Sequence, residues 1–212
     1  QLSGIGTADI RGFAHNGTGD RVIFTQDDSI YYSTDKGHSF AVALAQIDPS
    51  GSTAVGRNVV YLKDEERFVC IYHKPNQGLK FVTAAASDLT TWTSPVSAKD
   101  NSNNAVGSSA HLKACAAAGS TFLVCYGASY QRFTVSGSTI TNGTYSNNSL
   151  PHGNVQDVAS DGTGRWITAH KDGDLAVSSD DGASFSSLAT GVQVAQGDDD
   201  IFTIAADVIL PV

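Results

Sequence analysis

The feature that most constrains the fold is a unit of four short strand-like runs that the chain repeats four times. The second runs of the units align best. They begin at Arg21, Arg67, Thr121 and Arg165, which are 46, 54 and 44 residues apart, and each continues with apolar residues. The runs alternate or are β-branched, and Gly, Asn, Asp or Ser bounds them, as in short antiparallel strands. A four-stranded unit with a period of roughly 40–50 residues is typical of a β-propeller blade.

The composition agrees with an all-β fold of four-stranded antiparallel blades. Of the 212 residues, 41% are hydrophobic and only 16% are charged, and 21 are glycines, as in turn-rich β proteins. No window shows apolar residues at helical spacing over three turns, so we expect little or no helix. The net charge of −8 argues against a nucleic-acid partner, which would require a basic stripe. The sequence lacks an apolar run long enough for membrane insertion.

We predict a single β-propeller domain over residues 1–212, with blades at about 9–50, 54–104, 105–152 and 153–191. Residues 192–212 contain further strand-like runs, which we expect to form a fifth blade with the N-terminal strand. An open propeller edge has to be covered, so the tail could instead close a four-bladed ring. The chain could also be a slice of a larger ring whose other blades cover its edges. Since the chain begins at Gln1 without Met, we expect a processed or excised segment.

Three cysteines do not make a disulfide framework. Cys115 and Cys125 flank a short turn and could form a bridge across a hairpin, which would leave Cys70 unpaired. Cysteines are also often buried as free thiols, and the odd count favours this alternative.

One turn motif, Ser-x-Asp-x-Gly-x-x-Phe, occurs between the third and fourth runs of the first and fourth units. An Asp side chain can accept bonds from nearby backbone N–H groups, and Gly allows a backbone conformation that other residues resist. The second unit has a degenerate version, Ser87-Asp88-Leu89-Thr90-Thr91-Trp92, which also ends in an aromatic residue. The residues of the two complete copies are Ser33, Asp35, Gly37 and Phe40, and Ser178, Asp180, Gly182 and Phe185.

This motif resembles the Asp-box (BNR) repeat of sialidase-like β-propellers, which forms the hairpin between the last two strands of a blade. The resemblance implies that Asp35 and Asp180 are structural and lie away from the central ligand face. It brings no active-site motif. A sialidase uses three arginines and a Tyr–Glu pair, but here the Arg-Ile-Pro motif is absent and the only glutamates are Glu65 and Glu66.

Ligands of propellers meet the loops after the second strands and the connections between blades, so we sought binding residues there. The first runs open with Asp9, Arg11, Arg57, Asn58, His111, Lys113 and Asp157. The residues that we predict to bind a ligand are His73, Lys74, Asn76, His111, Tyr126, Tyr130, His170 and Lys171.

We predict no metal or other cofactor, because the histidines lack the spacing of a local ligand motif. Ca²⁺ at Asp198-Asp199-Asp200 is an alternative, since oxygen ligands suit it. We interpret Trp92 and Trp166 as packing residues within strands rather than as binding platforms.

Low charge, abundant Ser, Thr, Asn and Gly, and repeated hairpins resemble a bacteriophage tail or fibre module. Our first hypothesis is a non-enzymatic propeller, in a virion or extracellular, that binds a cell-surface glycan or receptor or docks on other virion proteins. An oligomer would be compatible with this role. The first alternative is a glycoside hydrolase that uses Asp9 and Asp157, because hydrolysis requires two facing carboxylates. The second is a secreted propeller lectin with repeated pockets, for which His73-Lys74 and His170-Lys171 are the only hint.

Overall fold

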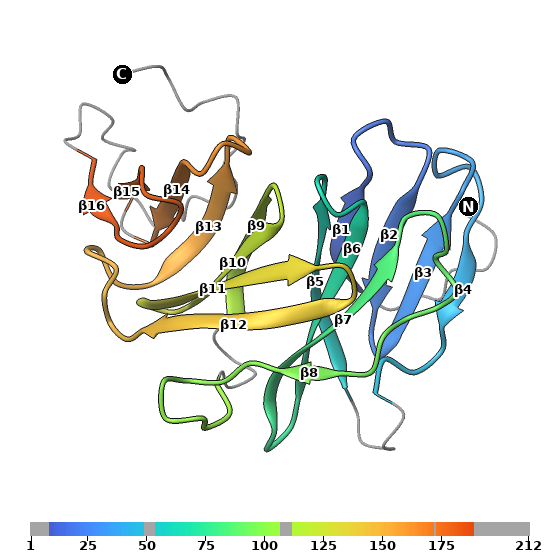
Figure 1. The fold of residues 1–212 in the computed structure, drawn as a ribbon, viewed down its shortest axis with the longest axis horizontal. Coiled ribbons are helices and arrows are strands. Elements are labelled where there is room, and N and C mark those ends of the chain that lie inside the picture. The colour runs from blue at the N-terminus through green and yellow to red at the C-terminus, as the bar shows by residue number, and fades with distance from the viewer. Residues whose placement is uncertain (1–8, 49–53, 107–111, 172, 189–212) are drawn as a thin grey trace. The chain divides into compact units, whose positions relative to one another are not determined.

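The computed structural model describes residues 9–48, 54–106, 112–171 and 173–188, and not the side chains of 113–115. Every regular element in these residues is a β-strand, and the strands form four antiparallel sheets of four strands each (Figure 1). The prediction of an all-β fold built from four-stranded antiparallel sheets is therefore confirmed. These residues contain no helix that could span a membrane.

Contacts group the sheets into two compact units. The first unit holds the two sheets β1–β4 and β5–β8, together with residues 135–140 at the β11–β12 turn. Its strands are β1 (Ile10–His15), β2 (Val22–Gln26), β3 (Ser29–Ser33), β4 (Ala41–Leu44), β5 (Val55–Leu62), β6 (Arg67–Lys74), β7 (Gly78–Ala85) and β8 (Val96–Ser97).

The second unit holds the rest of the sheet β9–β12 and the sheet β13–β16. In both units the strands of a sheet follow one another in chain order, as in a meander. The strands are β9 (Leu112–Ala118), β10 (Thr121–Tyr126), β11 (Ser129–Ser136), β12 (Thr139–Ser146), β13 (Val155–Ser160), β14 (Trp166–His170), β15 (Leu175–Ser178) and β16 (Ser186–Ser187).

The second strand of each sheet is its buried centre. All residues of β2, β10 and β14 are buried, and so are all of β6 after Arg67. A strand buried on both faces has to be apolar at nearly every position, which explains why the second runs align best in the sequence. The outermost strands β4 and β16 are exposed or only half-buried. Each buried aromatic or aliphatic side chain of the second strands contributes about 1.5–3 kcal/mol to folding.

Each unit has its own hydrophobic core. Ile23, Phe68 and Tyr72 belong to the core of the first unit, and Leu123 and Trp166 to that of the second. These cores lie between the two sheets of a unit, because each draws residues from both sheets.

Two cysteines lie in these interiors. Cys70 in β6 and Cys125 in β10 are fully buried free thiols, and burial raises the pKa of both. The alternative of a Cys115–Cys125 disulfide is wrong, since Cys125 is free. The register agrees, because the Cα of Cys115 is paired with that of Val124.

Backbone hydrogen bonds join the two sheets within each unit. In the first unit the carbonyl of Asp27, in the turn after β2, accepts a bond of 2.7 Å from the N–H of Gly56 in β5. In the second unit the carbonyl of Gly127, after β10, accepts a bond of 3.0 Å from the N–H of Val155 in β13. Both turn residues have positive φ, 49° at Asp27 and 63° at Gly127. The turn after a second strand thus anchors the first strand of the next sheet.

The four sheets fall within the first four predicted blade ranges. The predicted fifth blade, residues 192–212 with the N-terminal strand, lies outside the described residues. The closure of a ring and the single domain over residues 1–212 therefore stay predictions.

Candidate functional site

The first complete turn motif is a closed hydrogen-bond network between β3 and β4. Ser33 Oγ donates to Asp35 Oδ1 over 2.6 Å and accepts from the Gly37 N–H over 2.9 Å. The Asp35 carboxylate also accepts bonds from the N–H and the hydroxyl of Ser39. The ring of Phe40 packs edge-on against Phe24, with centroids 4.9 Å apart. These bonds lower the pKa of the Asp35 carboxyl.

The second complete motif, between β15 and β16, repeats these bonds. Ser178 Oγ donates to Asp180 Oδ1 over 2.7 Å and accepts from the Gly182 N–H over 2.9 Å, and Ser184 bonds the carboxylate through its N–H and hydroxyl. Bonds from Ser184 and then Ser178 lower the pKa of Asp180 to about 2. Phe185 packs edge-on against Tyr130 with centroids 5.0 Å apart. A carboxylate held in this way serves the turn, as a structural role requires.

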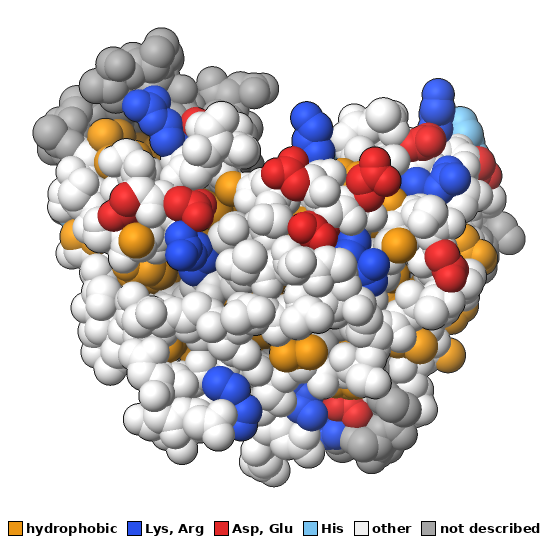
Figure 2. Space-filling model, viewed as in Figure 1, with side chains coloured by type: hydrophobic (Ala, Val, Ile, Leu, Met, Phe, Trp, Pro, Cys, Tyr) orange, Lys and Arg blue, Asp and Glu red, His pale blue; other side chains and the backbone are white. Residues whose placement is uncertain are grey.

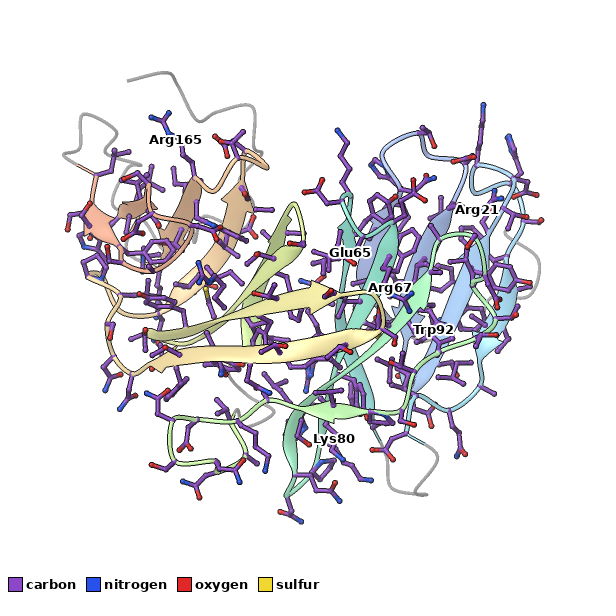
Figure 3. The ribbon with its side chains drawn as sticks, viewed as in Figure 1. Arg21, Glu65, Arg67, Lys80, Trp92 and Arg165 are labelled. Atoms are coloured by element: carbon purple, nitrogen blue, oxygen red, sulfur yellow. The ribbon has the colours of Figure 1, made fainter. Side chains whose placement is uncertain are left out.

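The degenerate turn after β7 is built differently. Asp88 accepts bonds from the N–H and hydroxyl of Thr90, and bonds from Thr91 and then Thr90 lower its pKa to about 2. When Asp88 is aligned with the Asp of the complete motifs, Ala86 takes the position of their Ser and Thr90 the position of their Gly. Strand β8 begins only at Val96, so Trp92 lies in the β7–β8 connection (Figure 3). The sequence-based interpretation that Trp92 lies within a strand is therefore wrong.

Two of the predicted ligand residues, His73 and Lys74, lie at the end of β6 and are buried. The Lys74 ammonium is 3.0 Å from a carboxylate oxygen of Asp48, and both side chains are less than 5% exposed. Lys80 is 3.8 Å from the same oxygen, and the Tyr72 hydroxyl donates to it over 3.3 Å. A ligand of Lys74 would have to replace this buried ion pair.

The other predicted residues have mixed settings. Asn76 is exposed in a turn with a φ of 63°, and Lys171 is exposed too. The sequence-predicted His111 lies outside the described residues. Tyr126 is buried, with the ring of Tyr145 at 6.0 Å.

Tyr130 and His170 are also buried, and both are bonded within the second unit. The Tyr130 hydroxyl donates to the Ala183 carbonyl over 2.9 Å. The ring of His170 donates from Nδ1 to the Gly153 carbonyl at 3.2 Å, and its Nε2 is 2.9 Å from Thr168 Oγ1. Burial lowers the pKa of His170. Several of the predicted ligand residues are thus buried within their own unit, and the meeting of the set at one surface stays a prediction.

The two carboxylates of the hydrolase alternative differ in setting. Asp9 is mostly exposed and lies 3.8 Å from a guanidinium nitrogen of Arg11. Asp157 accepts a bond of 2.9 Å from the N–H of Val158. They belong to different units, so their convergence stays a prediction. The described residues hold no cluster of His, Cys, Asp or Glu suited to a metal, and Asp198-Asp199-Asp200 lies outside them.

A pair of arginines lies where the first strands of the two sheets of the first unit meet. Arg11 and Arg57 each stand at a β-bulge, because the pairing registers of β1 and β5 skip these residues. A bulge leaves one residue unpaired and re-aims its side chain. The two strands approach so closely that a Cβ on Gly12 would lie 2.6 Å from the Asn58 Cα. Glycine is therefore required beside Arg11.

The arginine pair forms a positive site with an unused donor. Burial, and then the charge of Arg11, lower the pKa of the Arg57 guanidinium. Burial, and then the charge of Arg57, lower the pKa of the neighbouring His73. The Arg57 Nε is buried and has no hydrogen-bond partner among the described residues. The sequence placed Arg11 and Arg57 at strand starts but could not show that they lie near enough for the charge of one to lower the pKa of the other.

The remaining charges are dispersed. On the face in Figure 2, basic and acidic side chains alternate within a largely uncharged surface. Arg21, Arg67 and Arg165, labelled in Figure 3, lie at or just before the starts of second strands, at the opposite end of their sheets from the bulges. Arg67 donates from Nε to Thr83 Oγ1. These arginines do not contribute to the pair.

Comparisons with known proteins identify the fold. No protein family and no curated protein matches the sequence. Among solved structures, the chain is similar to the WD40 repeats of RRP9, with a TM-score of 0.60 and 10% identity over 89% of this chain and 53% of that one. It is similar to YCF48 with a bound peptide, with a TM-score of 0.54 and 16% identity over 88% of this chain and 56% of that one.

A chain of a nidogen/laminin complex is also similar, with a TM-score of 0.52 and 8% identity over 80% of this chain and 60% of that one. These neighbours are β-propellers, and the fold of this chain is that of a β-propeller. The chain spans only a little over half the length of these structures. Identities this low carry the fold and not the function.

Proposed function

We propose that the chain is a non-enzymatic binding propeller that recognises an acidic cell-surface glycan, as a module of a phage tail or another extracellular assembly. The observation that carries the proposal is the buried, unbonded Nε of Arg57 beside Arg11. A guanidinium matches a carboxylate or sulfate group through paired hydrogen bonds. An anion between the two arginines would use the free donor and relieve their repulsion.

A binding role agrees with the acid–base groups of the site better than hydrolysis does. Glycoside hydrolysis requires two carboxylates that face one bond, one of them with a raised pKa. The carboxylate next to the pair, Asp9, is mostly exposed and ion-paired with Arg11. The lowered pKa of His73 favours a neutral imidazole beside the pair, which adds no acid group to it.

A lectin with the same pocket in several blades is disfavoured by the His-Lys pairs. Lys74 is buried against Asp48, whereas Lys171 is exposed. The arginine of the β5 bulge corresponds to Gln156 at the β13 bulge. A basic residue thus stands at the bulges of β1, β5 and β9, as Arg11, Arg57 and Lys113, but not at the bulge of β13, so this position is repeated only in part.

The test is an array of sialylated, sulfated and uronic-acid glycans with neutral counterparts, in which hydrolysis products are monitored on every hit. We expect acidic hits without products. Arg57→Gln and Arg11→Gln should each weaken binding about tenfold to a hundredfold, because a hydrogen bond to a charged group contributes roughly 1.5–3 kcal/mol. The matched control is Arg21→Gln, whose partner Asp20 lies beside it on the surface.

Three outcomes would contradict the proposal. Products on the array would favour the hydrolase and direct mutagenesis to Asp9 and Asp157. Acidic hits that bind Arg57→Gln as tightly as the natural chain would place the site elsewhere. An array without hits would favour docking on other virion proteins.

A further inference from the structure

The first unit contains a groove between its two sheets, at the β7–β8 connection. It has a volume of about 430 Å³, which is within the range of small-molecule sites. One wall is the end of β4 and the residues after it, and the other is the connection before β8. We call it the Trp92 groove; its lining residues are Leu44, Gln46, Ile47, Thr90, Thr91, Trp92, Thr93, Ser94 and Pro95.

The aromatic wall of this groove is rigid. The Trp92 indole N–H donates to the Leu89 carbonyl over 3.0 Å, and one side of the ring packs against the core of the unit. The backbone of Thr93 donates to the Thr83 carbonyl, and its hydroxyl accepts from the Thr83 N–H, each over 3.0 Å. The half-buried ring is thus held in place before a ligand arrives, which lowers the entropy cost of binding.

The polar side chains of the groove are hydroxyls and one amide, without a charge. Thr90 and Thr91 already bond to Asp88. Within the described part of the chain, the exposed side chains of Gln46 and Ser94 have no bonding partner. The amide can donate and accept, and so can the hydroxyl. A rigid aromatic face beside uncharged donors and acceptors suits a ligand that is apolar on one face and carries hydroxyls at its edge.

The equivalent groove of the second unit is smaller. It has about 200 Å³ and is lined by β11, β12 and the complete turn motif. Tyr130 bonds across it to the Ala183 carbonyl, and an Arg132 nitrogen bonds to the carbonyl and carboxylate of Asp181, at 2.9 and 2.8 Å. The larger groove therefore occurs where the turn motif is degenerate.

We propose that the Trp92 groove binds an uncharged saccharide, which stacks on Trp92 and bonds through its hydroxyls to Gln46 and Ser94. The site is independent of the arginine pair and does not rest on the function proposed above. It would take neutral sugar units, whereas the arginine pair would take an acidic group.

Tryptophan emission provides the test, because Trp166 is fully buried in the other unit and Trp92 is therefore the reporter. The natural chain is titrated with neutral trisaccharides of glucose, galactose, mannose and N-acetylglucosamine. At least one should shift the emission, and calorimetry then gives the affinity of each variant. Gln46→Ala and Ser94→Ala should each weaken binding about fivefold, and Trp92→Ala about tenfold or more. Ser102→Ala, an exposed serine of the same unit outside the groove, should change nothing.

The two sites can fail separately. Arg57→Gln should leave the neutral trisaccharide affinity unchanged, and Gln46→Ala should leave acidic glycan binding unchanged. Gln46 and Ser94 are exposed, so their variants test the groove even if Trp92→Ala does not fold. Failure of every neutral trisaccharide to shift the emission or release heat at millimolar concentration would overturn the proposal. Sugar binding that Gln46→Ala and Ser94→Ala leave intact would also overturn it. The same holds if a proline-containing peptide binds the groove and none of the sugars does.

Discussion

The two units build the same junction between consecutive sheets but complete the groove beside it differently. In the second unit Tyr130 and Arg132, on β11, reach the complete turn motif and hold it by hydrogen bonds. The same positions of β3 in the first unit are Ile30 and Tyr32, and the turn that faces them is degenerate. Where the repeated turn is kept, its surroundings serve packing. Where it has been lost, a larger groove with uncharged lining side chains remains.

A second difference concerns the first strands. The bulge of β5 carries Arg57, with Arg11 beside it, whereas the bulge of β13 carries Gln156. The next residue, Asn58 or Asp157, accepts a bond from the following N–H in both units. In these two bulges a side-chain oxygen of the next residue thus supports the turn of the backbone, whereas the bulge residue itself differs. Both differences place the candidate binding chemistry in the first unit.

The largest effect should separate the two His-Lys pairs. Lys74→Met removes the close partner of the buried Asp48 carboxylate, and loss of one member of a buried ion pair costs about 3 kcal/mol of unfolding free energy. Lys171→Met, at an exposed site, should stay within about 0.5 kcal/mol. Urea unfolding of both variants measures the difference. Equal losses would mean that the Asp48 pair is not a feature that distinguishes the units.

The next effect should appear at the junction itself. Gly56 takes the place that Val155 has in the second unit, but a Cβ at Gly56 would lie 2.6 Å from the Thr25 Cβ. Gly56→Val should therefore lower the unfolding free energy by about 2 kcal/mol, as overpacking does. The double variant with Thr25→Gly should recover part of the loss. Thermal unfolding of the single and double variants tests this, and the absence of any recovery would contradict the contact.

A smaller effect should distinguish the complete turn from the degenerate one. Ser178→Ala leaves the buried Gly182 N–H without its acceptor, which costs about 1–2 kcal/mol. Ser187→Ala, an exposed serine of β16, is the control. Ala86→Ser in the degenerate turn should bring no comparable gain, because Thr90 replaces the glycine of the motif. Chemical denaturation that found such a gain would show that the degenerate turn can be rebuilt by one residue.

The last prediction concerns acid stability. His73 and His170 are held neutral, with pKa values below the ordinary 6.5, mainly by burial. Arg57 faces the first, and His152 and Asp174 face the second. Below pH 6.5 the unfolded chain takes up protons before the folded chain does, so stability falls until the lowered pKa values are reached. A separate loss begins below pH 3.8, as carboxyls such as Asp180, with its pKa of about 2, become protonated.

Unfolding free energies measured from neutral to acid pH test this. His73→Gln and His170→Gln should each flatten the first decline and leave the second unchanged. A decline near pH 6 that survives in both variants would assign it to other groups.

The sequence was sufficient for the strand pattern because the second strands are buried on both faces. Phe68 to Tyr72 and Phe122 to Tyr126 are continuously apolar for that reason. The turn motif was found between the third and fourth strands as expected, since its bonds are local and each partner lies within six residues of Ser33 or Ser178.

The candidate sites were harder to predict because they depend on contacts between distant segments. Lys74 looked like a loop lysine until Asp48 was seen beside it. Trp92 looked like a strand residue because the complete motifs are followed at once by a strand, whereas β8 begins only at Val96. Arg11 and Arg57 are far apart in the chain, and only the approach of β1 to β5 at Gly12 brings them together.

The two buried thiols make the units separately observable. Cys70 and Cys125 occupy the central strand of a sheet in the first and second unit, and neither can react with an alkylating reagent until its strand is exposed. In a Cys115→Ser background, the labelling rate of each thiol therefore reports the opening of its own half of the chain. Equal rates would mean that the halves open as one cooperative body, and unequal rates would tell which half opens first.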